Sequence, residues 1–320
     1  MDLVTLGEIL IDLTQTGVHA ERVRQFAAFP GGAPANVAVA AARLGLSVGF
    51  IGKVGADSFG RDLRRVLTDN NVSTEGLFET EQAPTTMAVV SVSPEGERSF
   101  SFYRSPGADT LLTKEEAAAA LAGYGPSARI LHVGSLSLTE EPARSATMEA
   151  LRRAKAAGML VSYDPNYRAA LWKSEKEAVR RMTEPMRYAD ILKVSEEELF
   201  LLTGSSDPRM GSLELGSMGP KLVLITLGAK GAFYRFGIHT GAVPGVSVTV
   251  ADTNGAGDSF LGAALSRLIR RGDEPLKDLT PAALEEIVAY ANAAAAVTCT
   301  RPGAIPALPT EEEVQKVFPG

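Results

Sequence analysis

Short apolar runs alternate with amphipathic segments along most of the chain, and this alternation restricts the fold more than any other feature. The runs have the length of buried strands, and the segments between them repeat apolar residues at helical spacing. The pattern predicts strands at 3–6, 48–51, 129–134, 160–163, 190–194, 221–227, 233–236 and 246–250. It predicts helices at 37–44, 57–71, 113–122, 141–157, 173–187, 195–203, 280–298 and 310–317. Strands that alternate with helices form a mostly parallel sheet with helices on both faces, so we predict an α/β fold.

A second, smaller sheet is predicted by residues 84–105. Apolar and polar residues alternate there on both sides of Pro94-Glu95-Gly96-Glu97, which is typical of a hairpin. Residues 13–30 are polar, aromatic and irregular, and part of them can join the hairpin. We therefore expect one domain over 1–320, with lid segments at about 12–30 and 84–105 that form a small antiparallel β lid.

Composition excludes several classes of protein. The 320 residues are 45% hydrophobic and 22% charged, which is ordinary for a soluble chain with a large core. The net charge is −6 and no basic block is present, which argues against nucleic acid as a partner. The N-terminus has no basic leader or long apolar run, so we expect no membrane span and a cytoplasmic protein. The single cysteine, Cys299, excludes an intrachain disulfide.

Residues 246–272 read as a strand, a glycine-rich turn and a helix that stops at Gly272. The first amides of a helix have no intrahelical partner, and the helix dipole adds positive charge there. Gly255 and Gly257 allow an anion to approach these amides, so the turn suits a phosphate. Asp258 would repel a bound phosphate, but it suits a base that deprotonates a hydroxyl attacking that phosphate. The alternative is that Asp258 is an N-cap and the glycines only shape the turn.

Polar residues follow several of the predicted strands. Asp12 ends the strand that opens the chain, and Asp164, Ser195, Gly228 and Asp252 follow later ones. Ligands of parallel sheets bind beyond the carboxyl ends of the strands. These positions therefore indicate the edge at which a site forms.

A polyol site is predicted near Gly31, Gly32 and Asn36. Two glycines let backbone amides contact a ligand, and Asn36 offers a donor and an acceptor in the first turn of a helix. Asp12 can accept two hydroxyl hydrogen bonds, which suits a vicinal diol. The alternatives are a plain loop for the glycines and capping roles for Asn36 and Asp12.

The run from Asp252 to Asp258 resembles the signature of ribokinase-type (PfkB) sugar kinases. GGAPANVAVAAARLG, FIGKVGADSFG and SYDPNYRAALW also resemble the fructokinases of that family, and the resemblance extends from residue 3 to about 305. It implies a ribokinase-like fold and ATP-dependent phosphorylation of a primary hydroxyl, with D-fructose giving fructose 6-phosphate. It implies that Asp258 is the base and that the amides of Gly255, Ala256 and Gly257 form an anion hole. The sugar-site residues that it implies are Asp12, Gly31, Gly32, Asn36, Arg104 and Arg168.

The same resemblance implies an ATP site, although no G-x-x-x-x-G-K-[ST] motif is present. Glu198 is expected to organise Mg²⁺ through water, and the alternative is a helix N-terminal acid. Ser195 stands where relatives often carry asparagine. Asp252 and residues 298–304 resemble a monovalent-cation loop, so K⁺ is a candidate. The expected nucleotide-binding residues are Lys193, Ser195, Thr226, Gly228, Gly231 and Asn292.

Other functions remain open at this point. A 2-keto-3-deoxygluconate kinase would also use Arg104 and Arg168, which can bind a carboxylate but are alternatively surface arginines. A riboside kinase of the same fold is another candidate, although the run 105–109 favours fructokinase. A catalytically inactive sugar-binding regulator would have lost the base or a turn glycine, and this chain has both. A homodimer through the lid is a further expectation.

Overall fold

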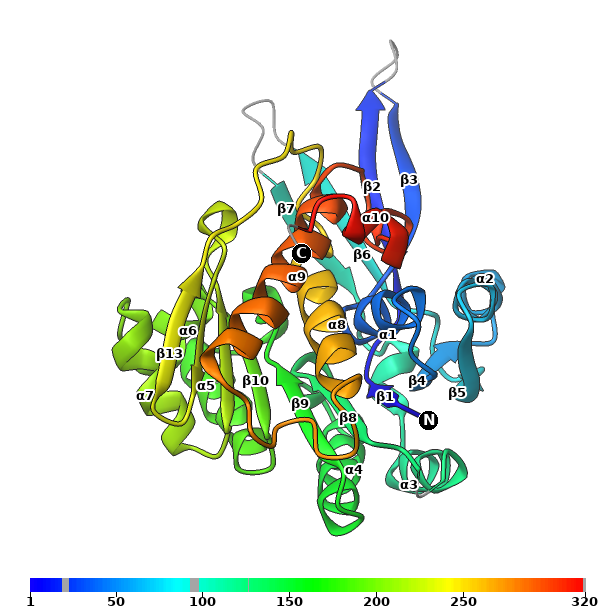
Figure 1. The fold of residues 1–320 in the computed structure, drawn as a ribbon. Helices are drawn as coiled ribbons and strands as arrows, with labels where there is room; N and C mark the ends of the chain where they lie inside the picture. Colours follow the sequence, from blue (N-terminus) through cyan, green and yellow to red (C-terminus); the bar gives the residue numbers. More distant parts are fainter. Residues whose placement is uncertain (19–22, 93–97, 126, 319–320) are drawn as a thin grey trace.

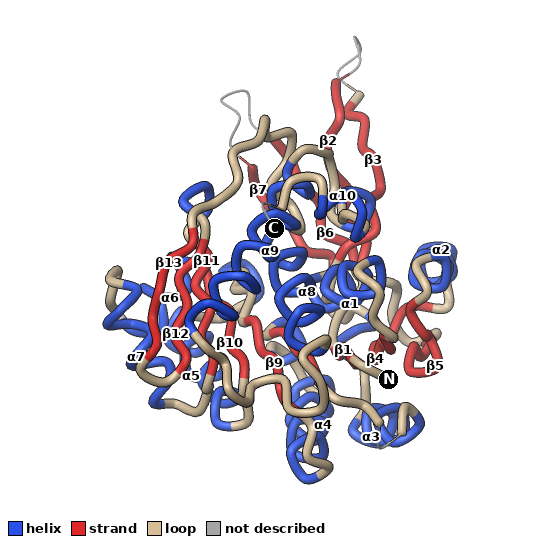
Figure 2. The backbone as a smooth tube through the Cα atoms, viewed as in Figure 1, coloured by secondary structure: helices blue, strands red, loops and turns tan. Residues whose placement is uncertain are grey.

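The computed structural model describes residues 1–18, 23–92, 98–125 and 127–318. The turn predicted at Pro94-Glu95-Gly96-Glu97 lies outside the described residues. Two sheets are visible, a large one through the body and a smaller one that rises above it (Figures 1 and 2).

The large sheet has the strand order β13-β12-β11-β10-β9-β8-β1-β4-β5. Its strands are β1 Leu3–Leu6, β4 Val48–Gly55, β5 Val72–Thr80, β8 Ile130–Gly134, β9 Leu160–Asp164, β10 Ile191–Ser195, β11 Leu222–Thr226, β12 Ala232–Phe236 and β13 His239–Val243. All neighbours pair in parallel except β11–β12 and β12–β13, which are antiparallel. The predicted mostly parallel sheet is therefore confirmed.

Helices cover both faces of this sheet, because successive residues of each strand point to opposite sides. In β1, Leu3 belongs to the core that α1, α2, α8 and α9 help to form on one face, whereas Val4 and Leu6 belong to the core that α3 to α7 help to form on the other. In Figure 1, α1, α8 and α9 lie in front of the strands. The helices are α1 Ala33–Arg43, α2 Ser58–Asp69, α3 Lys114–Gly123, α4 Ala143–Ala156, α5 Glu175–Thr183, α6 Glu196–Thr203, α7 Pro208–Ser217, α8 Ala256–Ile269, α9 Pro281–Cys299 and α10 Glu311–Gln315.

The small sheet has the order β3-β2-β6-β7. Its strands are β2 Leu10–Val18, β3 Arg24–Gly31, β6 Met87–Val92 and β7 Arg98–Tyr103. The pairs β2–β3 and β6–β7 are antiparallel, whereas β2–β6 is parallel. Residues 13–30, expected to be irregular, thus supply most of two strands. Asp12 lies inside β2 and not at the end of a central strand, so that expectation was wrong.

The strand predicted at 246–250 does not form. Pro244 and Gly245 end β13, and residues 246–250 then run as a loop in which Val250 is 59% exposed. A β-branched run needs a neighbouring strand for its ladder, and the described structure places none beside it. Asp252 therefore follows a loop, in contrast to Asp164 and Ser195, which end β9 and β10. Three further elements, α7, β5 and β13, were not predicted.

In the described part of the chain, none of the helices combines the length and the apolar character needed to cross a bilayer.

Candidate active site

Helix α8 begins at the expected turn, directly beyond the carboxyl ends of β9 and β10. Gly255 is its N-cap, with a left-handed φ of 76° that favours glycine, and it has no side chain to cap the first amides. A Cβ at Gly255 would lie 3.1 Å from the Cα of Ala304, so the turn is also closely packed. The amide of Ala256 donates to the carbonyl of Thr253 at 3.3 Å, and no side chain caps the other amides of this helix start, which suits them to an anion.

Asp258 is the third residue of α8 and is only 5% exposed. Asn36 Nδ2 donates to its Oδ2 at 2.7 Å, and Asn166 Nδ2 donates to its Oδ1 at 3.1 Å. Burial raises the pKa of Asp258, while the Asn36 hydrogen bond and the charge of Lys193 act against this rise. Because Gly255 is the N-cap, the alternative reading of Asp258 as a cap is excluded.

A small pocket of about 60 Å³ lies beside Asp258. Burial raises the pKa of Asp12 to about 6. A Cβ at Gly31 would lie 2.4 Å from Oδ2 of Asp12, so the glycine is needed for this carboxylate to fit. The lining residues that matter here are Glu8, Asp12, Gly32, Asn36, Asn166 and Arg168.

Glu8 belongs to this pocket and was not identified from the sequence. It is buried, and its Oε1 accepts a hydrogen bond from the amide of Ala33 at 3.0 Å. Its Oε2 has no hydrogen-bond partner among the described residues. Burial raises the pKa of Glu8 to about 7. The sequence feature that could have identified Glu8 is its position as an acid directly after the first buried strand, in Gly7-Glu8.

The two predicted arginines are placed differently. Arg168 is exposed and lines the pocket, and its guanidinium donates to the carbonyl of Tyr167 at 3.0 Å. Arg104 is 7% exposed and is not among the described residues that line the pocket. Its guanidinium pairs with Asp109 at 2.7 Å and donates to Thr139 Oγ1 at 2.7 Å and to the carbonyl of Leu136 at 2.9 Å.

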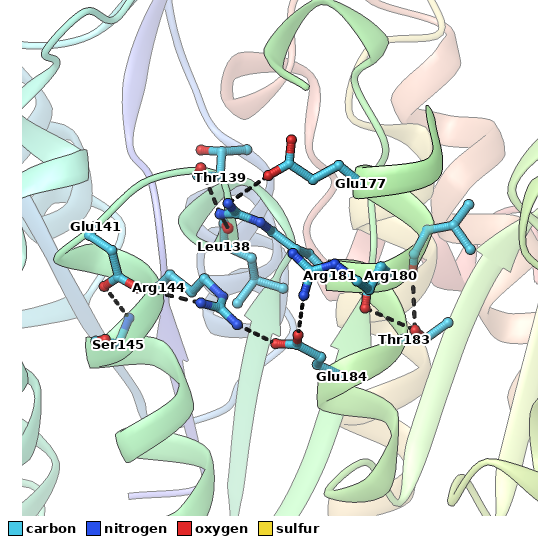
Figure 3. A network of polar contacts seen from close by, with 11 residues as sticks. Leu138, Thr139, Glu141, Arg144, Ser145, Glu177, Arg180, Arg181, Thr183 and Glu184 are labelled. Atoms are coloured by element: carbon cyan, nitrogen blue, oxygen red, sulfur yellow. Dashed lines mark hydrogen bonds and ion pairs between the residues drawn. The ribbon is translucent and has the colours of Figure 1, made fainter. Parts of the chain in front are cut away.

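The loop after β8, in which Leu136 and Thr139 accept from Arg104, also accepts hydrogen bonds from α5 (Figure 3). Arg181 of α5 donates to the carbonyls of Leu138 and Thr139, both at 3.0 Å, and pairs with Glu177 at 2.6 Å. The ion pair of Arg144 with Glu184, at 2.7 Å, joins α4 to the end of α5 in the same view. The loop after β8 is therefore fixed by contacts from α5 as well as by those from Arg104.

Lys193 of β10 is buried beneath the start of α8. Its Nζ lies 3.0 Å from Oδ2 of Asp164, and it would be 2.9 Å from a Cβ on Gly257. Burial lowers the pKa of Lys193, but Asp164, Glu198 and Asp258 outweigh this effect, so the net shift is upward. The ammonium is therefore a fixed positive charge at the turn.

Two larger cavities adjoin the turn. One, of about 930 Å³, is lined by Lys193, Ser195 and Thr226 among others. The second, of about 420 Å³, is lined by Thr226, Gly228, Gly231, Asn292 and Gly257 among others. Asn292 Nδ2 donates to the carbonyls of Val243 and Pro244, both at 3.1 Å. The structure thus brings all of the predicted nucleotide-binding residues to these two cavities.

Glu198 and Ser195 form a capping box at the start of α6. Ser195 Oγ accepts the Glu198 amide at 3.1 Å, and Glu198 Oε2 accepts the Ser195 amide at 2.8 Å. Glu198 Oε1 also accepts the amide of Tyr167 at 2.7 Å, and the side chain lines the larger cavity. Among the described residues, no three His, Cys, Asp or Glu side chains are arranged to bind a metal. These contacts fit the alternative reading of Glu198 as an N-terminal acid of α6, and a role toward Mg²⁺ through water stays a prediction.

Asp252 connects the turn to the segment after α9. Its Oδ1 accepts the amide of Asn254 and its Oδ2 accepts the amide of Gly303, both at 3.1 Å. Its own amide donates to the carbonyl of Cys299 at 3.3 Å. The two segments that resemble a monovalent-cation loop are therefore adjacent.

With this geometry described, comparison with known proteins gives the family. The model of the pfkB family of carbohydrate kinases matches residues 1–311. The chain belongs to this family. Fructokinase-1 of Oryza sativa subsp. japonica is 45% identical to this PfkB kinase over 319 residues, which are 99% of this chain and 97% of that protein.

Solved structures agree in fold. A fructokinase from Xylella fastidiosa with bound ATP has a TM-score of 0.90 and 36% identity, covering 98% of this chain and 97% of its own. A fructokinase from Vibrio cholerae O395, bound to fructose, ADP and a calcium ion, has a TM-score of 0.87 and 36% identity, covering 99% of each chain. The predicted ribokinase-like α/β fold is confirmed for this PfkB kinase.

Proposed function

We propose that this PfkB kinase transfers the γ-phosphoryl group of ATP to the primary hydroxyl of D-fructose and forms fructose 6-phosphate. A fructokinase at 45% identity over nearly the full length supports this reaction. The observation that carries the proposal is the position of Asp258. This buried carboxylate lies between the small polyol pocket and the anion turn, and it lines both the pocket and the larger cavity.

In this mechanism Asp258 accepts the proton of the sugar hydroxyl as the hydroxyl oxygen attacks the γ-phosphorus. The bond between the γ-phosphorus and the bridging oxygen breaks, and ADP leaves with the electron pair. The amides of Gly255, Ala256 and Gly257 stabilise the negative charge on the transferring group. Asp12, Asn36 and the amides at Gly31 and Gly32 orient the sugar.

ATP is proposed to occupy the two cavities that meet at Thr226 and Gly257. Asn292, with the loop carbonyls that it holds, shapes the smaller cavity for the base. Lys193 supplies a positive charge beneath the turn. Mg²⁺, when bound, neutralises phosphate charge, and Glu198 would hold it through water. K⁺ is proposed near Asp252; a comparison of turnover in potassium and tetramethylammonium salts tests this.

The lid is proposed to be the small sheet, with segments at about 12–30 and 84–105 of a single kinase domain. Closure would exclude water, since an open site would hydrolyse ATP. Val18, Phe26 and Tyr103 of this sheet are exposed apolar side chains, which supports the proposed homodimer through the lid. A monomeric mass in solution by light scattering would contradict that dimer. A cytoplasmic location stays a prediction.

The choice of a neutral sugar over a sugar acid follows from the charges at the pocket. Glu8 and Asp12 present carboxyl groups, and the guanidinium of Arg104 is engaged by Asp109. A carboxylate substrate would meet like charge, with Arg168 as its only arginine partner among the pocket-lining residues that the structure describes. We therefore favour fructose over 2-keto-3-deoxygluconate. The test is an ADP-release assay across fructose, 2-keto-3-deoxygluconate, ribose and nucleosides, and a highest kcat/KM on any other acceptor overturns the choice.

The role of Asp258 is tested with Asp258→Asn, which keeps the shape of the side chain. We expect kcat to fall by roughly 10²–10⁴-fold with fructose binding retained. Asp62→Asn on α2, an exposed aspartate, is the matched control and should retain wild-type turnover. Near-wild-type turnover of a folded Asp258→Asn protein contradicts the mechanism. Tight sugar binding with no turnover in the wild type would support the inactive-regulator alternative.

A further inference from the structure

A chain of three buried side chains leads from beneath the anion turn to Asp258. Lys193 pairs with Asp164 at 3.0 Å, and Asp164 Oδ1 accepts the amide of Asn166 at 3.1 Å. The Asn166 side chain then donates to Asp258 Oδ1 at 3.1 Å. Asp164 is 2% exposed and Asn166 is 9% exposed. Neither residue has a role in the mechanism described so far.

The backbone of Asn166 is fixed in an uncommon conformation. Its φ of 47° lies in the left-handed region, which only glycine and, less readily, asparagine or aspartate adopt without large strain. Asp164 stabilises this conformation, because its carboxylate accepts the Asn166 amide in an Asx turn. The ion pair with Lys193 fixes Asp164, and Asp164 fixes the backbone of Asn166. These two buried residues therefore determine the direction of the Asn166 side chain.

Asn166 and Asn36 contact Asp258 from different parts of the chain and on different oxygens. Asn36 approaches Asp258 from α1, 222 residues away, and donates to Oδ2. Asn166 approaches from the end of β9, 92 residues away, and donates to Oδ1. One donor on each oxygen fixes the plane of the carboxylate, and a carboxylate retains further lone pairs for a sugar hydroxyl.

We propose that Asn166 is a positioning residue for the base: it fixes the orientation of the Asp258 carboxylate, and Asp164 holds it in place. This inference rests on the proposed role of Asp258. A hydrogen bond to a charged acceptor is strong, and a base must face the hydroxyl during the transfer. Loss of the Asn166 side chain therefore lowers the rate of phosphoryl transfer more than it weakens substrate binding.

The experiment uses Asn166→Gly, because glycine accepts the left-handed backbone and removes only the side chain. We expect kcat to fall roughly 10- to 100-fold, with KM for fructose and for ATP within about threefold of wild type. Asn166→Asp keeps the shape but places a second acceptor against Asp258, so its kcat should fall further. The matched control is Asn71→Gly, since Asn71 is exposed, has a φ of 58° and lies outside the site; it should keep wild-type kinetics.

A double-variant cycle separates positioning of the base from other roles. In an Asp258→Asn background, Asn166→Gly should cause no further loss of the residual rate, because the group that it positions is gone. An equal loss in both backgrounds overturns the inference, as does a raised KM for fructose with unchanged kcat, which would make Asn166 a sugar ligand. A kcat of Asn166→Gly within threefold of wild type also overturns it. Near-wild-type turnover of Asp258→Asn alone is a different result, and it contradicts the proposed base itself.

Discussion

Arg104 gives the sharpest test of how the site is supported. The sequence predicted that it binds the sugar, whereas in the structure its guanidinium contacts Asp109, Thr139 and Leu136. Its guanidinium pairs with Asp109 through Nη2 at 2.7 Å and Nε at 2.8 Å. The two side chains are 4% and 3% exposed, so the pair is desolvated. Arg104 follows β7 of the small sheet, whereas its partners Leu136 and Thr139 follow β8 of the large sheet. The ion pair therefore lies where the two sheets join.

The variant Arg104→Ala leaves the buried carboxylate of Asp109 without its cation. Removal of one partner of a buried pair costs about 3–5 kcal/mol, because the remaining charge stays desolvated. Replacement of both partners, as in Arg104→Met with Asp109→Leu, removes that charge and should recover most of the loss. A direct contact with the sugar predicts a different result, in which stability is kept and kcat/KM for fructose falls.

Urea unfolding followed by tryptophan fluorescence measures the change, with Trp172 as the single tryptophan. The matched control is Arg152→Ala, because the Arg152 side chain is 58% exposed in its pair with Glu149; the midpoint of this variant should equal that of wild type. A loss below about 1 kcal/mol for Arg104→Ala would refute the reasoning from the buried pair. A double variant that is no more stable than Arg104→Ala would refute it as well.

Two further predictions concern the nucleotide cavity and the sugar pocket. Asn292→Ala should raise KM for ATP roughly tenfold and leave KM for fructose unchanged in steady-state assays, because the amide holds two loop carbonyls of the nucleotide cavity. Asp12→Asn should increase thermal stability at neutral pH and not near pH 4. Burial raises the pKa of Asp12 from 3.8 to about 6, so the native state binds its proton more tightly than the unfolded state, and wild-type stability is lost as pH rises between these values. An Asp12→Asn gain that is equal at pH 4 and pH 8 would contradict this.

The large sheet was predictable because its central strands are buried on both faces. Such strands read as continuous apolar runs, and Leu222–Thr226 is an example in which four of the five residues are fully enclosed. The run 246–250 has the same local character but no adjacent strand. Strand formation there depends on a partner distant in sequence, which local pattern does not contain.

The small sheet was only half predictable for a related reason. The hairpin of β6 and β7 alternates apolar and polar residues, whereas β2 has two buried residues at its start and partly or fully exposed ones after them. A strand without one clearly buried face has no regular alternation. Residues 13–30 therefore appeared irregular, although they supply the strand that carries Asp12.

The site was predictable where its residues lie close together in the sequence and form a recognisable motif. Gly255, Gly257 and Asp258 lie within four positions, and Gly31, Gly32 and Asn36 lie within six. Asn166 and Glu8 were missed as contributors because their importance comes from contacts between distant segments. The engagement of Arg104 by Asp109 was missed too, since an arginine near a predicted pocket gives no indication of where its guanidinium points.

The contact between Asn36 and Asp258 also depends on the close packing of α8 against α1 at Gly262, which could not be predicted from the sequence. Gly262 lies one helical turn beyond Asp258 on α8, and Ala40 lies one turn beyond Asn36 on α1. A Cβ at Gly262 would be 2.7 Å from the Cβ of Ala40 and 3.2 Å from the carbonyl oxygen of Val37. The two helices can approach this closely only because position 262 has no side chain. Because the same two helices carry Asn36 and Asp258, a larger residue at 262 would separate the amide from the carboxylate, and the glycine therefore contributes to the site without lining it.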